Sequence, residues 1–74
     1  MKKLRYMILE GVARFGREKS IIEMLSEAGL NYSKAQLANA TKHLEMLGLI
    51  HQTQPGVLVA EVTPFGRELL QSVR

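Results

Sequence analysis

The sequence predicts a mainly α fold with a small β-hairpin, in the order helix, helix, helix, strand, strand, helix (α-α-α-β-β-α). Three observations predict it: apolar residues recur at helical spacing over four segments, capping residues and glycines bound these segments, and a turn signal separates two strand-like runs. We expect a single domain over residues 1–74, with helices at about 3–15, 20–28, 34–47 and 64–73 and a hairpin at about 49–62.

Composition and charge restrict the class of protein. The 74 residues are 46% hydrophobic, which is typical of one small globular domain with a thin core. The chain has no cysteine, which excludes disulfides and thiolate metal sites. It shows neither a signal peptide nor a membrane span, so we expect a soluble, cytoplasmic protein of prokaryotic type. The net charge of +3 weakly favours a polyanionic partner.

The first predicted helix is more apolar than one buried stripe requires. Four residues recur at helical spacing and would face the core: Leu4, Ile8, Val12 and Phe15. Three others widen this surface: Tyr6, Met7 and Leu9. Either the helix is deeply buried or a second side of it contacts another chain.

The second and third predicted helices are joined by a short turn, which is the helix-turn-helix arrangement. Ser20 with Glu23 forms a capping box, Gly29 is a stop signal, and Ser33 caps the third helix. At 100° per residue, one face of the third helix carries Leu37, Ala40, Thr41, Leu44 and Leu47. The outward side carries Ala35, Ala38, Asn39, Lys42, His43 and Met46, with Lys34 and Gln36 on the flanks.

Glycine and proline mark the remaining boundaries. Gly48 is expected to take a left-handed conformation where the third helix ends and a strand begins. In the turn Gln54-Pro55-Gly56, proline presets the first angle and glycine permits a positive φ next. Alternating Leu58, Ala60 and Val62 indicate a half-buried strand, and Thr63 with Pro64 begins the last helix. Phe65, Leu69 and Val73 line one side of that helix.

Two local motifs resemble those of known regulators. The first is Leu44-Glu45-Met46-Leu47-Gly48-Leu49-Ile50, and the second is Val62-Thr63-Pro64-Phe65-Gly66-Arg67-Glu68-Leu69-Leu70. Together they resemble winged helix-turn-helix DNA-binding domains of the broad MarR-like group and of small archaeal regulators. The resemblance covers nearly the whole chain. It implies a sequence-specific, double-stranded DNA-binding transcriptional regulator without a cofactor, and we expect it to act as a homodimer.

In such folds the third helix lies in the major groove. The resemblance therefore implies that DNA contacts come from Ser33, Lys34, Gln36, Asn39, Lys42 and His43. Asn39 and Gln36 carry paired donor and acceptor atoms that match adenine, and the lysines could contact guanine or phosphate. Arg17 and Lys19, just before the second helix, are candidates for backbone contacts. The predicted hairpin has no Arg or Lys between Gln52 and Val62.

Other functions are less well supported. The modest charge of residues 31–56 leaves a winged-helix protein-interaction module as an alternative, and a sequence-neutral architectural DNA binder is another. His43 and His51 have no acidic or thiol neighbours at ligand spacing, so we expect no metal site. The serines lack the base that a nucleophile needs, so we expect no enzyme. Lys2, Lys3 and Arg5 are interpreted as a solubilising terminus rather than a DNA-contacting arm.

Overall fold

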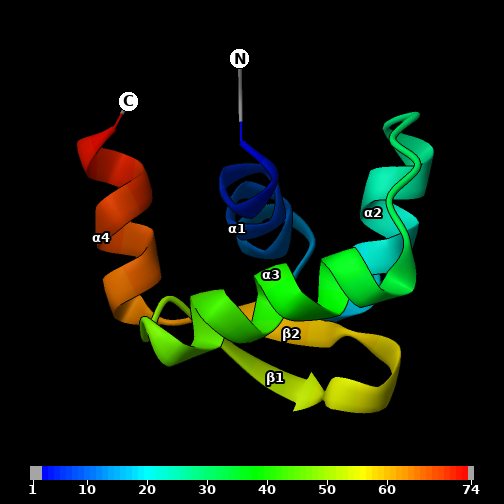
Figure 1. The fold of residues 1–74 in the computed structure, drawn as a ribbon. Coiled ribbons are helices and arrows are strands. Elements are labelled where there is room, and N and C mark those ends of the chain that lie inside the picture. The colour runs from blue at the N-terminus through cyan, green and yellow to red at the C-terminus, as the bar shows by residue number, and fades with distance from the viewer. Residues whose placement is uncertain (1–2, 74) are drawn as a thin grey trace.

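A computed structural model of the protein describes residues 3–73, and its elements follow the predicted order (Figure 1). The fold class, mainly α with a small antiparallel hairpin, is confirmed. The helices are α1 (Leu4–Phe15), α2 (Ile21–Glu27), α3 (Lys34–Met46) and α4 (Pro64–Ser72). The strands are β1 (Ile50–Gln54) and β2 (Val59–Val62), and two short 3-10 helices are η1 (Gly16–Glu18) and η2 (Pro55–Val57).

Helix α1 lies at the centre of the molecule. Figure 1 shows it between α4 and α2, with α3 crossing in front. Ile8, Leu9 and Val12 are buried, and Tyr6 and Met7 pack against the core that they form. The helix contacts α2, α3, α4 and β2. The chain's own elements therefore cover most of the wide apolar surface of α1.

Both helices of the α2–α3 pair begin at a complete capping box. The Ser20 hydroxyl accepts a hydrogen bond from the Glu23 backbone N–H at 3.1 Å, and the Glu23 carboxylate accepts one from the Ser20 N–H at 3.0 Å. Ser33 and Gln36 repeat this exchange. Each box satisfies two backbone N–H groups that a helix start leaves unpaired, so the two starts are fixed locally.

The same two helices end in the same way. Gly29 has φ +79° and Gly48 has φ +76°, both in the left-handed region that glycine adopts readily. In each case the amide after the glycine donates to a carbonyl five residues earlier, Leu30 to Leu25 at 2.9 Å and Leu49 to Leu44 at 3.0 Å. This is the Schellman motif, and it confirms both predicted stops.

One apolar residue that we predicted on a buried face lies exposed. Leu47 was expected to share the core face with Leu44, but it is 51% exposed because α3 ends at Met46 and Leu47 is already its C-cap. Ile22 is also exposed, since Ile21 occupies the core side of α2 and the next residue is turned by 100°.

The hairpin differs from the prediction at its tip. Strands β1 and β2 pair antiparallel, with Ile50 opposite Val62 and a register shift between Gln52 and Gln54. We expected the positive φ at Gly56, but it is at Leu58, with φ +55°. Leu58 is buried, and its carbonyl accepts a hydrogen bond from the Ile21 N–H at 2.8 Å. Burial and this bond hold a conformation that leucine otherwise rarely adopts.

Helix α4 is attached to the turn between α3 and β1. The Thr63 N–H donates to the Leu49 carbonyl at 3.1 Å, and the Thr63 hydroxyl donates to the Gly48 carbonyl at 2.5 Å. That hydroxyl also accepts from the Gly66 N–H at 3.0 Å, which confirms Thr63 as the cap. The two motifs that carry the family resemblance are therefore in direct contact.

Within residues 3–73, every helix is too short or too polar to cross a bilayer.

Candidate nucleic-acid interface

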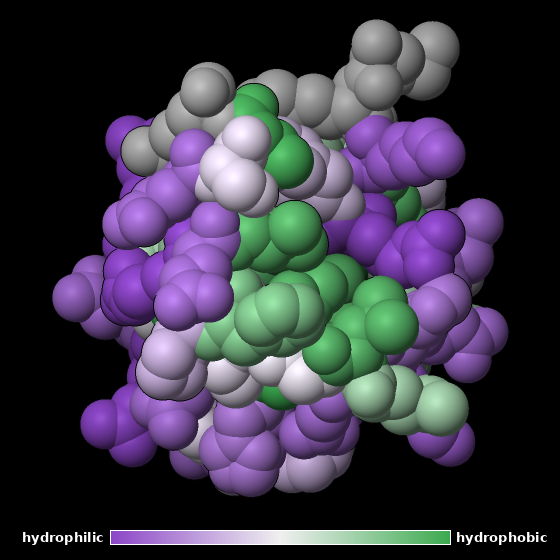
Figure 2. Space-filling model, turned by 90° about the vertical axis from the view of Figure 1, so that its left-hand side faces the viewer, coloured by the Kyte–Doolittle hydropathy of each residue, from purple (hydrophilic) through white to green (hydrophobic). Residues whose placement is uncertain are grey.

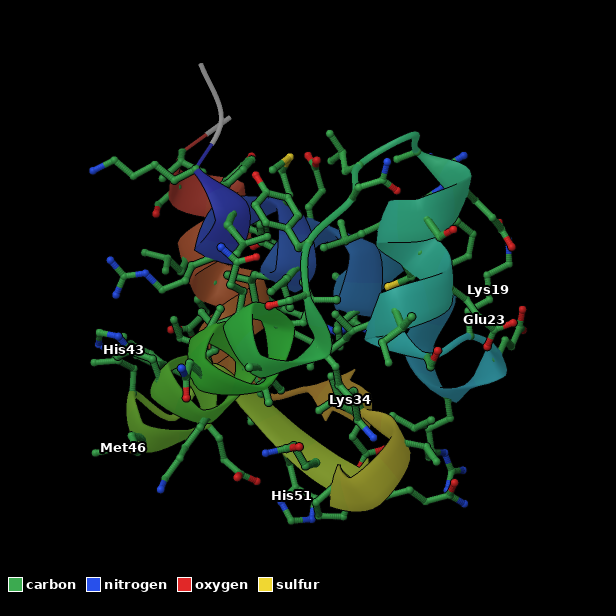
Figure 3. All side chains as sticks on the ribbon, turned by 45° about the vertical axis from the view of Figure 1, so that its right-hand side comes forward. Lys19, Glu23, Lys34, His43, Met46 and His51 are labelled. Atoms are coloured by element: carbon green, nitrogen blue, oxygen red, sulfur yellow. The ribbon has the colours of Figure 1, made fainter. Side chains whose placement is uncertain are left out.

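The outward side of α3 carries a row of exposed polar side chains. Leu37, Thr41 and Leu44 turn the opposite side into the core. The buried Thr41 hydroxyl donates to the Leu37 carbonyl at 2.6 Å, which satisfies it without disturbing the packing. All six predicted third-helix residues are exposed: Ser33, Lys34, Gln36, Asn39, Lys42 and His43. Figure 3 labels two of them, Lys34 and His43.

These six side chains are not equally available. Gln36 uses its side-chain oxygen to accept from the Ser33 N–H at 2.9 Å, within the capping box. A paired contact between Gln36 and adenine would therefore break the helix cap. Lys34, Asn39 and Lys42, in contrast, make no side-chain hydrogen bond or ion pair with other residues of the described chain.

The two alanines predicted on the outward side of α3 are placed differently. Ala35 is exposed, so close approach there is open. Ala38 is partly buried and packs against the core, contrary to the expectation that it lies on the outward side. Leu37 lies on the core face of α3, and Ala38, the next residue, lies at the margin of that face.

Arg5 joins this surface, although the sequence interpretation assigned it to a solubilising terminus. Its guanidinium donates to Nδ1 of His43 at 2.7 Å, so the start of α1 lies beside the second half of α3. The signal was present, because Arg5 is four residues before the buried Leu9 and so shares its helix face. Lys3 is the N-cap of α1, and Lys2 lies outside the described residues.

Arg17 and Lys19 lie away from α3. Lys19 forms an ion pair with Glu27, and its ammonium lies 4.6 Å from the centre of the Phe15 ring. Arg17, in η1, borders a hollow beside the hairpin that Thr53 and Gln54 also line. These two cations are thus associated with α2 and the hairpin, and Lys19 is already engaged.

The charge around Lys19 is mixed. Glu23 is close to it, and the backbone hydrogen bond from Ser20 is the main reason that the pKa of Glu23 is lowered. Lys19 itself lowers that pKa further by its positive charge. A phosphate approaching this end of α2 would meet carboxylates as well as cations, which weakens the case for a backbone contact here.

Glu45 connects the hairpin to α3 by hydrogen bonds. Its carboxylate accepts from the Gln52 backbone N–H at 2.9 Å and from the Gln52 side-chain amide at 3.2 Å, while Nδ1 of His51 lies 3.7 Å away. The backbone bond from Gln52 is the main cause that lowers the pKa of Glu45. A fixed negative charge therefore lies between α3 and β1, next to the His51–Glu61 strand pair.

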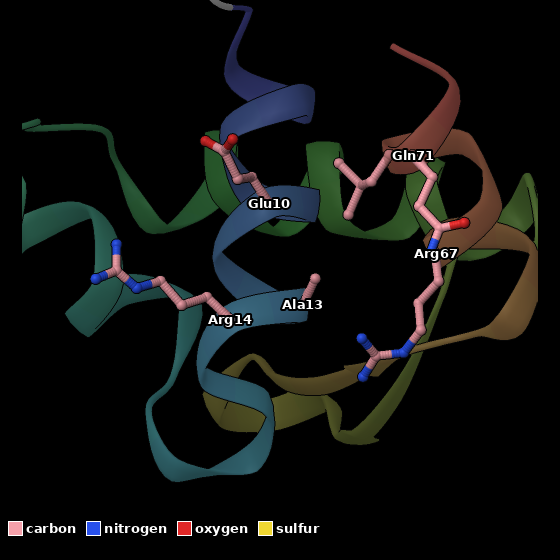
Figure 4. A pocket seen from close by; sticks show the side chains of 6 residues that line it. Glu10, Ala13, Arg14, Arg67 and Gln71 are labelled. Atoms are coloured by element: carbon pink, nitrogen blue, oxygen red, sulfur yellow. The ribbon is translucent and has the colours of Figure 1, made fainter. Parts of the chain in front are cut away.

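A separate hollow of about 370 Å³ lies between α1 and α4 (Figure 4). Its lining residues are Glu10, Ala13, Arg14, Arg67, Leu70 and Gln71. Figure 4 shows the Arg14 side chain extending from α1 away from α4, while the Arg67 side chain extends from α4 toward the hairpin, so they do not converge on a common ligand position. Within residues 3–73, no three His, Asp or Glu side chains group as metal ligands would.

Comparison with known proteins finds no matching family model, no matching curated protein and no matching solved structure.

Proposed function

We propose that the protein binds double-stranded DNA through α3 and acts as a sequence-specific transcriptional regulator of the winged helix-turn-helix type. One observation carries the proposal. Lys34, Asn39 and Lys42 are exposed on one side of α3 and have no side-chain partner among residues 3–73. Two cations and an amide without internal partners are the groups that contact phosphates and base edges.

In this proposal α3 enters the major groove. Asn39 reads adenine through its paired donor and acceptor, and Lys34 and Lys42 contact phosphate or guanine. Arg5 adds a phosphate contact at the far end of α3, where it already reaches His43. Ala35 allows the helix to approach the bases closely. Ser33 and Gln36 maintain the helix start, whose partial positive charge favours a nearby phosphate.

A homodimer fits the same proposal, because two copies related by a two-fold axis would present two α3 helices to successive turns of one duplex. We also propose a cytoplasmic location, because the DNA of a prokaryotic-type cell lies in the cytoplasm.

A salt series tests the proposal. Fluorescence anisotropy with a labelled random-sequence duplex should show binding at low salt that weakens as salt rises. If Arg5, Lys34 and Lys42 each contact one phosphate, log K should fall with log[salt] with a slope of about −3 for each copy bound. Selection from a random duplex pool should then enrich one sequence, whereas equal recovery of all sequences would indicate an architectural binder instead.

A protein-interaction module is the second candidate, and the hairpin favours it. Between Gln52 and Val62 the hairpin has no Lys or Arg, and Glu45 and Glu61 lie beside His51. This edge would repel the phosphates that flank a bound helix. Absence of any duplex binding at low salt would support this second candidate and overturn the first.

A further inference from the structure

The hollow beside the hairpin has a volume of about 750 Å³ and mixed polar and apolar walls. We call it the η1–hairpin hollow. The residues that matter for its chemistry come from two segments: Phe15, Arg17 and Glu18 from the first, and Thr53, Gln54 and Val59 from the second. The exposed apolar side chains of α4, such as Phe65 and Val73, gather instead on the side of the molecule that Figure 2 shows. The η1–hairpin hollow is therefore separate from that apolar surface.

Three unusual backbone conformations shape the walls of this hollow. Gly16 has φ +58° and ends α1, so that the chain passes into η1, which contacts β2. Thr53 lies at the register shift between β1 and β2. Leu58, directly before Val59, has φ +55°. Register shifts and left-handed residues are frequent beside binding sites, where they redirect side chains.

Phe15 and Val59 supply the apolar part of the hollow, and both are half-buried. Two cations hold the Phe15 ring. The Lys19 ammonium lies 4.6 Å from the centre of the ring, and the guanidinium carbon of Arg14 lies 5.3 Å from it. Because its position is fixed before a ligand arrives, the ring offers an apolar wall that needs little further ordering on binding.

Arg17 and Glu18 bring opposite charges to the same hollow. Both side chains are exposed, and neither forms a hydrogen bond or an ion pair with another residue of the described chain. Consecutive residues of a 3-10 helix are about 120° apart, so the two side chains leave η1 in different directions. A phosphate would be repelled by Glu18, and a simple cation would be repelled by Arg17. A ligand that carries both a carboxylate and an ammonium group satisfies both residues.

Thr53 and Gln54 complete the polar side of the hollow. The Thr53 hydroxyl donates to the Val59 carbonyl at 3.3 Å, which leaves its lone pairs to accept from an ammonium group. The Gln54 side chain is exposed and makes no hydrogen bond within residues 3–73. Because its amide both donates and accepts, it is able to bind either charged end of such a ligand.

We propose that the η1–hairpin hollow binds an apolar α-amino acid. Arg17 binds its carboxylate, Glu18 binds its ammonium group, and its side chain packs against Phe15 and Val59. The volume of about 750 Å³ lies in the range of small-molecule sites, which place a few polar groups beside apolar walls. The site goes beyond the proposed function, because it uses none of the residues assigned there to DNA and requires no DNA to bind.

Titration of the full chain with L-leucine, followed by the NMR shifts of its backbone amides without DNA, tests the site. L-leucine should shift the amides of residues 16–18, 53, 54 and 59, and these shifts give its dissociation constant. Isocaproate is leucine without the ammonium group, and isoamylamine is leucine without the carboxylate. Each should bind the wild type about tenfold more weakly, because it loses one charge-assisted hydrogen bond.

Two variants assign the two charges. Arg17→Gln should weaken the binding of L-leucine about tenfold but bind isoamylamine no more weakly than the wild type, since that ligand has no carboxylate. Glu18→Gln should likewise weaken the binding of L-leucine but bind isocaproate no more weakly. Both positions are exposed, so the spectra of the free variants should show an unchanged fold. Arg67→Gln removes an exposed cation from the hollow between α1 and α4, and as the matched control it should not change the affinity.

Unshifted amides around the hollow at every concentration up to the solubility of L-leucine would overturn the site. So would equal affinities of the wild type for L-leucine, isocaproate and isoamylamine, a comparison that needs no variant. An equal loss of affinity in Arg17→Gln and Arg67→Gln would reduce the effect to net charge and would also overturn it. A chain that binds duplex DNA but no L-leucine would refute this site alone, and one that binds L-leucine but no duplex would refute only the proposed function.

Discussion

Gly66 approaches the backbone of Leu49 so closely that a Cβ on Gly66 would lie 2.2 Å from the Leu49 carbonyl oxygen and 2.8 Å from Cγ2 of Val62. The carbonyl belongs to the turn after α3 and also accepts from the Thr63 N–H, so it cannot move aside without breaking that bond. The absence of a side chain at position 66 therefore sets how α4 docks against the end of α3.

Gly66→Ala should consequently destabilise the fold by about 2 kcal/mol or more, because a backbone atom has to shift. Urea denaturation followed by circular dichroism measures this free energy. Gly56→Ala is the control, since its Cβ would meet no atom within 4 Å and its φ is not positive. That change should alter the stability by less than about 1 kcal/mol. Equal midpoints for the two variants would contradict the close approach.

Gly48→Val should destabilise the fold by more than about 1 kcal/mol, because a β-branched residue resists the left-handed conformation. The cost arises from φ alone, as a Cβ at Gly48 would meet nothing within 4 Å. Gly48→Asn should therefore cost less than Gly48→Val, since asparagine tolerates this conformation. The melting temperatures of both variants provide the comparison, and an unshifted value for valine would refute the role of Gly48 as the helix stop.

Lys34→Ala and Lys42→Ala should each weaken duplex binding and lower the salt slope by about one unit. Both side chains are exposed, so the melting temperature should stay nearly constant. Arg67→Ala removes the same charge from α4 and should leave the affinity close to that of the wild type. Unaltered affinity in both lysine variants would remove α3 from the interface.

Glu45 should make the stability of the hairpin depend on pH. Its pKa is lowered in the folded protein, so its ionised form stabilises the fold above the unfolded value of about 4.3. This contribution is lost as the pH falls through the folded pKa. Glu45→Gln should therefore be less stable than the wild type at pH 7, and the difference should shrink at pH 3. The midpoints of urea denaturation at both pH values measure this difference in stability. A difference that is the same at both pH values would contradict the prediction.

The exposed Glu61 on the neighbouring strand offers a matched control for that experiment. Glu61→Gln should retain the pH dependence of the wild type, because the hydrogen bonds to Gln52 come from Glu45.

The helix ends were predictable because their causes are local. Ser20, Ser33 and Thr63 each cap a helix through a bond to a residue three positions away, and Gly29 and Gly48 end helices through their own φ. Such patterns appear in the sequence at fixed spacing, so the element order and most boundaries followed from them.

The remaining features depend on contacts between distant segments. The positive φ at Leu58 arises from packing against the start of α2, so the favourable Gly56 was a misleading signal. Arg5 meets His43 across 38 positions of the chain. The ion pair between Lys19 and Glu27 likewise depends on how the chain passes from η1 into α2. Spacing along one helix places Arg5 on the face of Leu9 but does not pair it with His43, and it predicts neither of the other two contacts. This is why the candidate interface gained Arg5 and lost much of the case for Lys19.

The central position of α1 has a consequence for how the chain acquires its shape during synthesis. Helix α1 is made before β2 and α4, and it contacts both of them. A nascent chain that ends before Leu70 therefore leaves part of the apolar surface of α1 uncovered, and local helix formation alone cannot compensate for that loss. Folding should accordingly wait until α4 has left the ribosome and then proceed as one cooperative step.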